Sequence, residues 1–252
     1  MYQRICLLMA VLFFSLTTGA IAKMPPADRV VIVLTSHATL GDKSGDPTGY
    51  YLSEAAHAYY IFKEAGLGVD FASPKGGSAP VTGLDVKDPL NTKFLNDAEA
   101  QAAVAGTLKL SELDPKDYKA IYYAGGHGVM WDFAQTPAIG ALGRAIYENG
   151  GIVSAVCHGP AALVNLKLSN GKYLVDGKRI ATFTNKEEAA IKLTKVVPFA
   201  LETALVDRGA KVIKADLFQP KTVVDGRLVT GQNPASAKGV ARAVVDLIIQ
   251  HR

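Results

Sequence analysis

Cysteine is scarce in this sequence, which holds two cysteines among 252 residues. Cys6 lies in an N-terminal apolar stretch that we expect to be removed, so the mature chain would keep Cys157 alone. A single thiol forms no internal disulfide, which excludes a disulfide framework as a source of stability. An unpaired thiol in an exported protein is either a liability or a working group, and the residues around Cys157 favour the second.

The sequence also lacks an apolar run long enough to span a membrane comfortably, which takes about 20 residues. Its apolar stretch at residues 5–16 follows the positive charge of Arg4 and ends at the small-residue sequence Ala20-Ile21-Ala22. This order is typical of a secretory signal peptide. We therefore expect residues 1–22 to be cleaved and the mature protein to be periplasmic or secreted, without stable membrane association. An uncleaved N-terminal anchor is the alternative.

Charge of one sign is not concentrated anywhere in the chain. The 27 basic and 23 acidic residues give a formal net charge of +4, which becomes +3 when Arg4 leaves with the signal peptide. The basic residues form no run and are not interleaved with aromatics, so we expect no nucleic-acid partner. With no internal repeat and no interdomain linker, residues 23–252 are predicted to form one domain, for which their number is ample.

Strand and helix patterns alternate along the chain, which predicts a mostly parallel sheet with helices on both faces. We expect strands at residues 30–34, 69–72, 120–124 and directly before Cys157, and helices at 51–65, 97–110, 137–148, 160–166, 199–207 and 235–250. Asp-Gly pairs predict hairpins at residues 174–180 and 223–230. Residues 73–96 are rich in proline, glycine and aspartate and are expected to form an extended surface insertion.

The most informative stretch is GGIVSAVCHGP, which begins at Gly150. It predicts a buried strand that delivers Cys157 to a sharp turn, followed by a helix. The small residues Ala155 and Gly159, two positions before and after the cysteine, suit a nucleophile elbow. The dipole of the following helix would favour the thiolate. The alternative is a small apolar cysteine packed at the end of a strand.

Further candidates are predicted at the same carboxyl edge of the sheet. The glycines of Gly125-Gly126-His127-Gly128 follow a strand, and their amides, with that of His158, could form an oxyanion hole. The alternative is a plain glycine turn. Glu54 lies in the first turn of the first helix, where a carboxylate could move protons, although an acid at this place is usually just a partner of the helix dipole.

A catalytic cysteine also needs a base. His158 is the economical candidate because it is adjacent to Cys157, and either Glu187 or Glu188 could orient it. The chain has no late His-x-Glu pair, which weighs against a glutaminase-type triad. No spacing of ligands supports a metal site.

Four ordered motifs carry a resemblance to a known family. They are TGYYLSEAAH from Thr48, GGHG from Gly125, AVCHGPA from Ala155 and VTGQNPAS from Val229. Together they resemble the ThiJ/PfpI superfamily, which is class I glutamine amidotransferase-like. Within it they are similar to the branch of glutathione-independent glyoxalase III and its heat-shock chaperone relatives.

The resemblance implies an α/β fold, a flavodoxin-like three-layer sandwich with a nucleophile elbow, which is usually a homodimer and needs no cofactor or metal. Its motifs match Cys157 to the nucleophile, His158 to its histidine and Glu54 to the glutamate that contacts the sulfur. The register favours Glu188 over Glu187 as the acid that orients the histidine. The segment with Gly125, Gly126 and His127 would line the substrate.

The function that the resemblance implies is conversion of 2-oxoaldehydes such as methylglyoxal to 2-hydroxy acids, by a cofactor-independent lyase of the glyoxalase III (D-lactate dehydratase) type. One alternative is a stress-related chaperone, protein deglycase or oxidation sensor. Another is a cysteine peptidase or amide hydrolase, because the same nucleophile, histidine and acid could serve it. Export departs from the better-known cytosolic members, so their cytosolic metabolite-repair role does not carry over.

Overall fold

The computed structural model describes residues 28–41 and 45–251, and the expected signal peptide lies outside them. Its strands are β1 (Arg29–Val33), β2 (Tyr50–Tyr51), β3 (Gly68–Ser73), β4 (Val81–Thr82), β5 (Leu108–Lys109), β6 (Tyr118–Tyr123), β7 (Ile152–Val156), β8 (Arg179–Ile180), β9 (Lys211–Val212), β10 (Thr222–Asp225) and β11 (Leu228–Gly231). Its α-helices are α1 (Leu52–Glu64), α2 (Pro89–Asn96), α3 (Ala98–Ala105), α4 (Val129–Asp132), α5 (Pro137–Glu148), α6 (Asn185–Ala190), α7 (Leu201–Val206) and α8 (Ala237–Gln250). None of the helices in these two ranges is long and apolar enough to cross a membrane.

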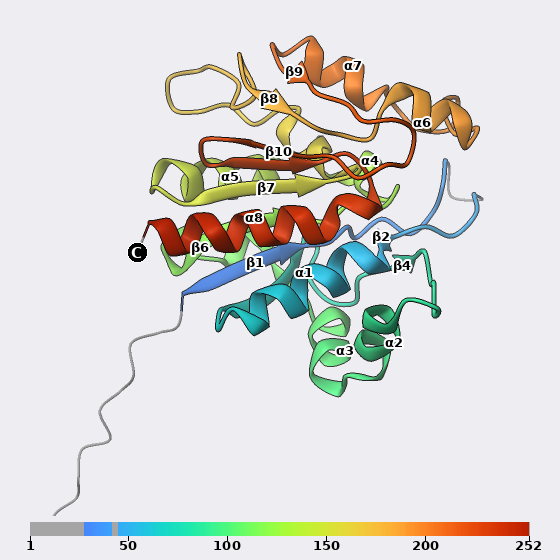
Figure 1. Cartoon of the computed structure of the whole chain (residues 1–252), viewed down its shortest axis with the longest axis vertical. Coiled ribbons are helices and arrows are strands. Elements are labelled where there is room, and N and C mark those ends of the chain that lie inside the picture. The colour runs from blue at the N-terminus through green and yellow to red at the C-terminus, as the bar shows by residue number, and fades with distance from the viewer. Residues whose placement is uncertain (1–27, 42–44, 252) are drawn as a thin grey trace, which may run out of the picture.

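Seven of the strands form the central sheet, in the order β10-β11-β7-β6-β1-β3-β5. Neighbouring strands are parallel except at the β10–β11 hairpin. Helices α1 and α8 lie across one face, while α5 lies on the other (Figure 1). The sheet and its two helical layers confirm the predicted α/β sandwich.

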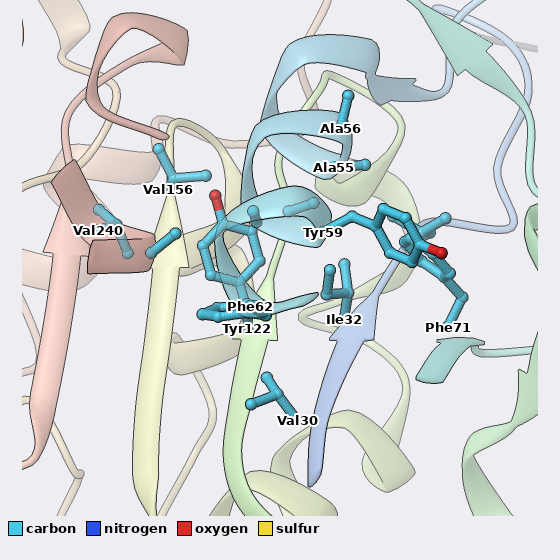
Figure 2. Close-up of a cluster of buried hydrophobic side chains, with 14 of the residues drawn as sticks. Val30, Ile32, Ala55, Ala56, Tyr59, Phe62, Phe71, Tyr122, Val156 and Val240 are labelled. Carbon is cyan, nitrogen blue, oxygen red and sulfur yellow. The ribbon is translucent and has the colours of Figure 1, made fainter. Parts of the chain in front are cut away.

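Burial on both faces explains the continuous apolar runs of the sheet. In β1, Val30 and Ile32 pack toward α1 and α8, while Val31 and Val33 pack toward the α5 face. Because helices cover both sides, successive side chains of a central parallel strand are all buried, and the strand is apolar at every position. Figure 2 shows the cluster beneath α1. In it the rings of Phe62 and Tyr122 meet edge to face, with their centroids 5.8 Å apart.

The predicted surface insertion at residues 73–96 is more ordered than expected. It contains β4, which pairs with β2, and α2, which begins at Pro89. The side chain of Asp88 accepts hydrogen bonds from the amides of Leu90 and Asn91 and so caps α2. An N-cap aspartate followed by proline at the first helical position is a helix-start signal, and the prediction of an extended segment was wrong there.

Four other predictions from local pattern differ from the structure. Residues 174–180 form no hairpin, because Leu174 and Val175 pack into the core and β8 pairs in parallel with β9 instead. The helix expected at 160–166 is a short 3-10 helix, Gly159–Leu163. The helix expected at 97–110 ends at Ala105, and the one expected at 199–207 is the shorter α7.

Candidate active site

Cys157 stands at a sharp turn directly after β7. Its φ angle is 61°, in the left-handed region that few residues other than glycine adopt. Its N–H donates to the carbonyl of Gly231 over 2.9 Å, and its carbonyl accepts from the N–H of Phe183 over 2.8 Å. A Cβ at Gly159 would lie 2.2 Å from the carbonyl oxygen of Tyr123. The turn therefore has the geometry of a nucleophile elbow, with glycine required two residues after the cysteine.

Glu54 approaches the same sulfur from the first turn of α1. Its side chain is fully buried and lies within interaction distance of the Cys157 thiol. Carboxyl oxygen Oε2 accepts a hydrogen bond from the N–H of Gly125 at 2.6 Å. The other oxygen, Oε1, has no nitrogen or oxygen partner among the described residues. The site thus holds a buried carboxyl group directly beside the candidate nucleophile, and one oxygen of this group has no nitrogen or oxygen partner among the described residues.

His158 links the sulfur to a second carboxylate. Its Nδ1 lies 3.3 Å from Sγ of Cys157, and its Nε2 lies 2.7 Å from Oε2 of Glu188. If Nε2 carries the ring proton and donates it to the carboxylate, Nδ1 has a free lone pair facing the thiol. This arrangement suits a base that takes the thiol proton.

Glu187, the neighbouring acid, has a different position. Its carboxylate accepts hydrogen bonds from the N–H and hydroxyl of Thr184 and from the N–H of Phe218. The side-chain amides of Gln232 and Asn233 also donate to it. Glu187 therefore ties the start of α6 to the GQN motif after β11, and Glu188 alone of the two acids faces His158.

His127, which was expected to line the substrate, contacts the acid and the histidine of the site. Its Nε2 lies 3.0 Å from Oε1 of Glu188, and its ring centroid is 4.1 Å from that of His158. One carboxylate thus joins two imidazoles, an arrangement that sequence reasoning missed. The loop after β6 and the start of α6 meet only in the folded chain, so no local signal could have revealed it.

Comparison with known proteins shows to which family the chain belongs. The model of the DJ-1/PfpI family matches residues 48–247. The chain belongs to the DJ-1/PfpI family. The matched region contains every candidate site residue named above, from Glu54 to Asn233.

Among curated DJ-1/PfpI relatives, the chain is 32% identical to Glyoxalase 3 of Candida albicans over 228 residues, covering 86% of this chain and 97% of the relative. It is 33% identical to glutathione-independent glyoxalase HSP31 of Saccharomyces cerevisiae over 232 residues, covering 87% and 98%. The crystal structure of glyoxalase III from Candida albicans aligns with a TM-score of 0.80 at 30% identity, covering 87% and 96% of the two chains. Rapid Encystment Protein 24 KDa of Francisella tularensis aligns at 0.83 with 38% identity, covering 87% and 98%.

Burial controls the proton equilibria around the sulfur of this DJ-1/PfpI site. It raises the pKa of Glu54 to about 8, against the opposing effect of the hydrogen bond from Gly125. Burial and the charge of Glu54 raise the pKa of the Cys157 thiol. Because burial raises the pKa of Glu54 above neutrality, Glu54 holds a proton near neutral pH, and it can donate this proton toward a thiolate.

In the His158–Glu188 pair, the pKa values of both groups are lowered. Burial lowers the pKa of His158 to about 4, although Glu188 opposes this effect. Hydrogen bonds from His127 and His158 outweigh burial and lower the pKa of Glu188 to about 2. At neutral pH the pair is a neutral imidazole beside a carboxylate, which is the state needed to accept a proton.

The amides around the sulfur differ from the predicted arrangement. The N–H of Gly125 is engaged by Glu54, while those of Gly126 and His158 donate toward the sulfur. The helix after Cys157 is a single short 3-10 segment, and burial together with the charge of Glu54 raises the pKa of the thiol. The prediction of a helix whose dipole favours thiolate over thiol was wrong in its net effect, and the amides of Gly126 and His158 are the donors available for an oxyanion.

His127, His158 and Glu188 are the one group in the described ranges whose potential metal-ligand atoms all lie within 4.8 Å of one another. The two hydrogen bonds that Glu188 makes with the imidazoles account for this closeness. The group is thus complete as a proton-transfer network, and the expectation that no metal or cofactor is needed stays a prediction.

Proposed function

We propose that the protein is a glutathione-independent glyoxalase that converts 2-oxoaldehydes such as methylglyoxal into 2-hydroxy acids. The observation that carries the proposal is the position of Cys157, on an elbow between the protonated Glu54 and the neutral His158. The two curated relatives described above bear glyoxalase names and match along nearly their whole length, which supports it.

The first step joins substrate and enzyme. Nδ1 of His158 takes the thiol proton, and the sulfur of Cys157 adds to the aldehyde carbon. The oxygen of that carbon becomes an oxyanion, which the amides of Gly126 and His158 stabilise and the carboxyl group of Glu54 protonates. The product is a hemithioacetal beside a Glu54 carboxylate and a His158 imidazolium, with the imidazolium stabilised by Glu188.

The second step moves hydrogen within the substrate. The Glu54 carboxylate removes the proton from the former aldehyde carbon while His158 protonates the neighbouring carbonyl oxygen, which gives an enediol. Return of the proton to the second carbon, with loss of the first hydroxyl proton to His158, gives a thioester. Water then hydrolyses the thioester and restores the thiol. The sum is methylglyoxal plus water to lactate, in which one carbon is oxidised and its neighbour reduced, so no external oxidant is needed.

Burial of the sulfur favours a small substrate. Cys157 is 3% exposed, and a peptidase must present its nucleophile to an extended chain in an open cleft. The ring of His158, whose Nδ1 lies 3.3 Å from the sulfur, packs against the ring of Phe183, with the two centroids 4.3 Å apart. A two- or three-carbon oxoaldehyde fits this arrangement better than a polypeptide does.

The setting of the reaction belongs to the same proposal. We infer from the signal-peptide pattern at residues 1–22 that the enzyme acts after export, as residues 23–252, in the periplasm or outside the cell. We also infer, from the resemblance noted above, that it acts as a homodimer. Mass analysis of the secreted form and its mass in solution test both statements.

The test of the activity is turnover of methylglyoxal by residues 23–252, without glutathione or added metal, beside Cys157→Ala. We expect lactate from the unmodified protein and none from the variant, while both give the same far-UV circular dichroism. Turnover by Cys157→Ala at the unmodified rate would refute the mechanism. If neither protein makes lactate, the chaperone and oxidation-sensor alternatives gain, and suppression of aggregation by the same two proteins decides between them.

A further inference from the structure

Tyr122 is a fully buried residue that the proposed mechanism does not use. It stands on β6, its exposed fraction is 0%, and its hydroxyl has no hydrogen-bond partner among the described residues. Figure 2 shows its ring against Phe62, with the hydroxyl directed toward Val156, the residue before the nucleophile. A polar atom thus points from the core toward the underside of the active site.

Tyr123, the next residue, shows how a buried tyrosine hydroxyl is normally bonded. Tyr123 is also fully buried, but it faces the opposite side of the sheet and its hydroxyl donates to the carbonyl of Ile139 over 2.7 Å. Buried hydroxyl groups are nearly always bonded in this way, because a partnerless one loses its hydration without compensation. The unbonded hydroxyl of Tyr122 therefore requires a physical explanation.

A second partnerless atom lies nearby. Oε1 of Glu54 is buried and without a nitrogen or oxygen partner, and Glu54 and Cys157 are the two charges that raise the pKa of Tyr122, after burial itself. The phenol therefore keeps its proton at every working pH and remains a donor. Two buried polar atoms without a hydrogen-bond partner, on residues that are electrostatically coupled to each other and to Cys157, form the kind of site that a single water molecule occupies in protein interiors.

We propose that Tyr122 is a positioning residue: its hydroxyl and Oε1 of Glu54 hold one buried water beneath Cys157, and through this water the phenol donates a hydrogen bond toward the Glu54–Cys157 pair. Such a donor stabilises the single negative charge that the pair carries during catalysis. Tyr122 would thereby set the proton affinity of the nucleophile from the core side, opposite to His158.

The other ionisable groups around the pair are few. Tyr51 faces it from the start of α1, and His158 faces it from the elbow, with His127 and Glu188 behind. Helix α8 packs against α1 and brings the charge of Lys238, which acts on His57, one turn beyond Glu54. Tyr122 differs from these groups because it stands on β6 and approaches from the central sheet.

The test measures the rate of Cys157 alkylation by iodoacetamide from pH 5 to pH 10. The inference rests on the proposed nucleophile but not on its substrate, so the assay remains valid even if methylglyoxal is not turned over. We expect Tyr122→Phe to raise the apparent pKa of alkylation by about one unit, which is a tenfold loss of thiolate at a fixed lower pH. Tyr123→Phe is the matched control, since it removes a bonded hydroxyl on the far face and should leave the profile unchanged.

Two outcomes would overturn the proposal. One is an alkylation profile of Tyr122→Phe that superimposes on that of the unmodified protein, together with a raised melting temperature, as expected when a truly unpaired hydroxyl is removed. The other concerns the Glu54→Gln background, which changes the charge to which the water is bound. There the same substitution should shift the profile by less than half as much, and an undiminished shift would show that Tyr122 acts independently of Glu54.

Discussion

Replacement of Glu54 by glutamine should make the protein more stable at alkaline pH while abolishing its catalysis. The carboxyl group is fully buried, and burial raises its pKa from 4.5 to about 8. A carboxyl group with a raised folded-state pKa stabilises the fold fully only below its unfolded pKa, and this stability is lost as the pH rises through the folded pKa. Glutamine keeps an oxygen for the N–H of Gly125 but cannot ionise.

The magnitude follows from the two pKa values. Between pH 5 and pH 8 the unfolded chain releases the Glu54 proton while the folded protein largely keeps it. Linkage then predicts that this one group lowers the free energy of unfolding by about 3.5 kcal/mol over that interval. Between pH 5 and pH 8, the free energy of unfolding of Glu54→Gln should therefore fall by about 3.5 kcal/mol less than that of the unmodified protein.

Urea unfolding at pH 5, 6, 7 and 8 measures this difference. Glu64→Gln is the matched control, because Glu64 lies on the same helix and is exposed, and its curve should run parallel to that of the unmodified protein. A parallel curve for Glu54→Gln would refute the reasoning, since it would mean that Glu54 is already ionised at neutral pH. In that case the acid that protonates the oxyanion must be another group.

Two further predictions concern the acids and the elbow. Glu188→Gln should lower kcat/KM for the oxoaldehyde about 100-fold, because the carboxylate that stabilises the imidazolium is lost. Glu187→Gln should mainly lower the free energy of unfolding, by about 1–3 kcal/mol. Steady-state kinetics and urea unfolding of both variants separate the two roles, and equal losses of kcat/KM would contradict them. Gly159→Ala should cost about 2 kcal/mol or more, since its Cβ would meet the carbonyl of Tyr123 at 2.2 Å. Gly140→Ala, whose Cβ would meet nothing closer than 3.7 Å, should be neutral or stabilising, and equal melting temperatures for the two variants would count against the elbow geometry.

Much of the fold could be predicted because its signals are local. The apolar run of β1, the helical spacing in α1 and α5 and the Asp-Gly turn between β10 and β11 each occupy consecutive residues. Where pattern reasoning failed, a tertiary contact decided the outcome. Leu174 and Val175 follow a hairpin pattern, but the core offers them more burial than a hairpin would.

For the site, the sequence by itself determined the chemical groups and the elbow. Residue types around Cys157 restrict the backbone to a turn that glycine alone permits at position 159, and this restriction acts within a few bonds. The placement of Glu54 in a first helical turn likewise follows from local pattern.

Tertiary structure alone decided how these groups are paired and charged. It placed Glu188, the acid that the resemblance favours, beside His158, gave Glu188 a second imidazole from His127, and engaged the amide of Gly125 with Glu54. It also reversed the expected effect on the thiol, because burial and a neighbouring carboxyl group raise its pKa. Proton affinity depends on solvent exclusion and on charges that are distant in sequence, so only the packed chain determines it.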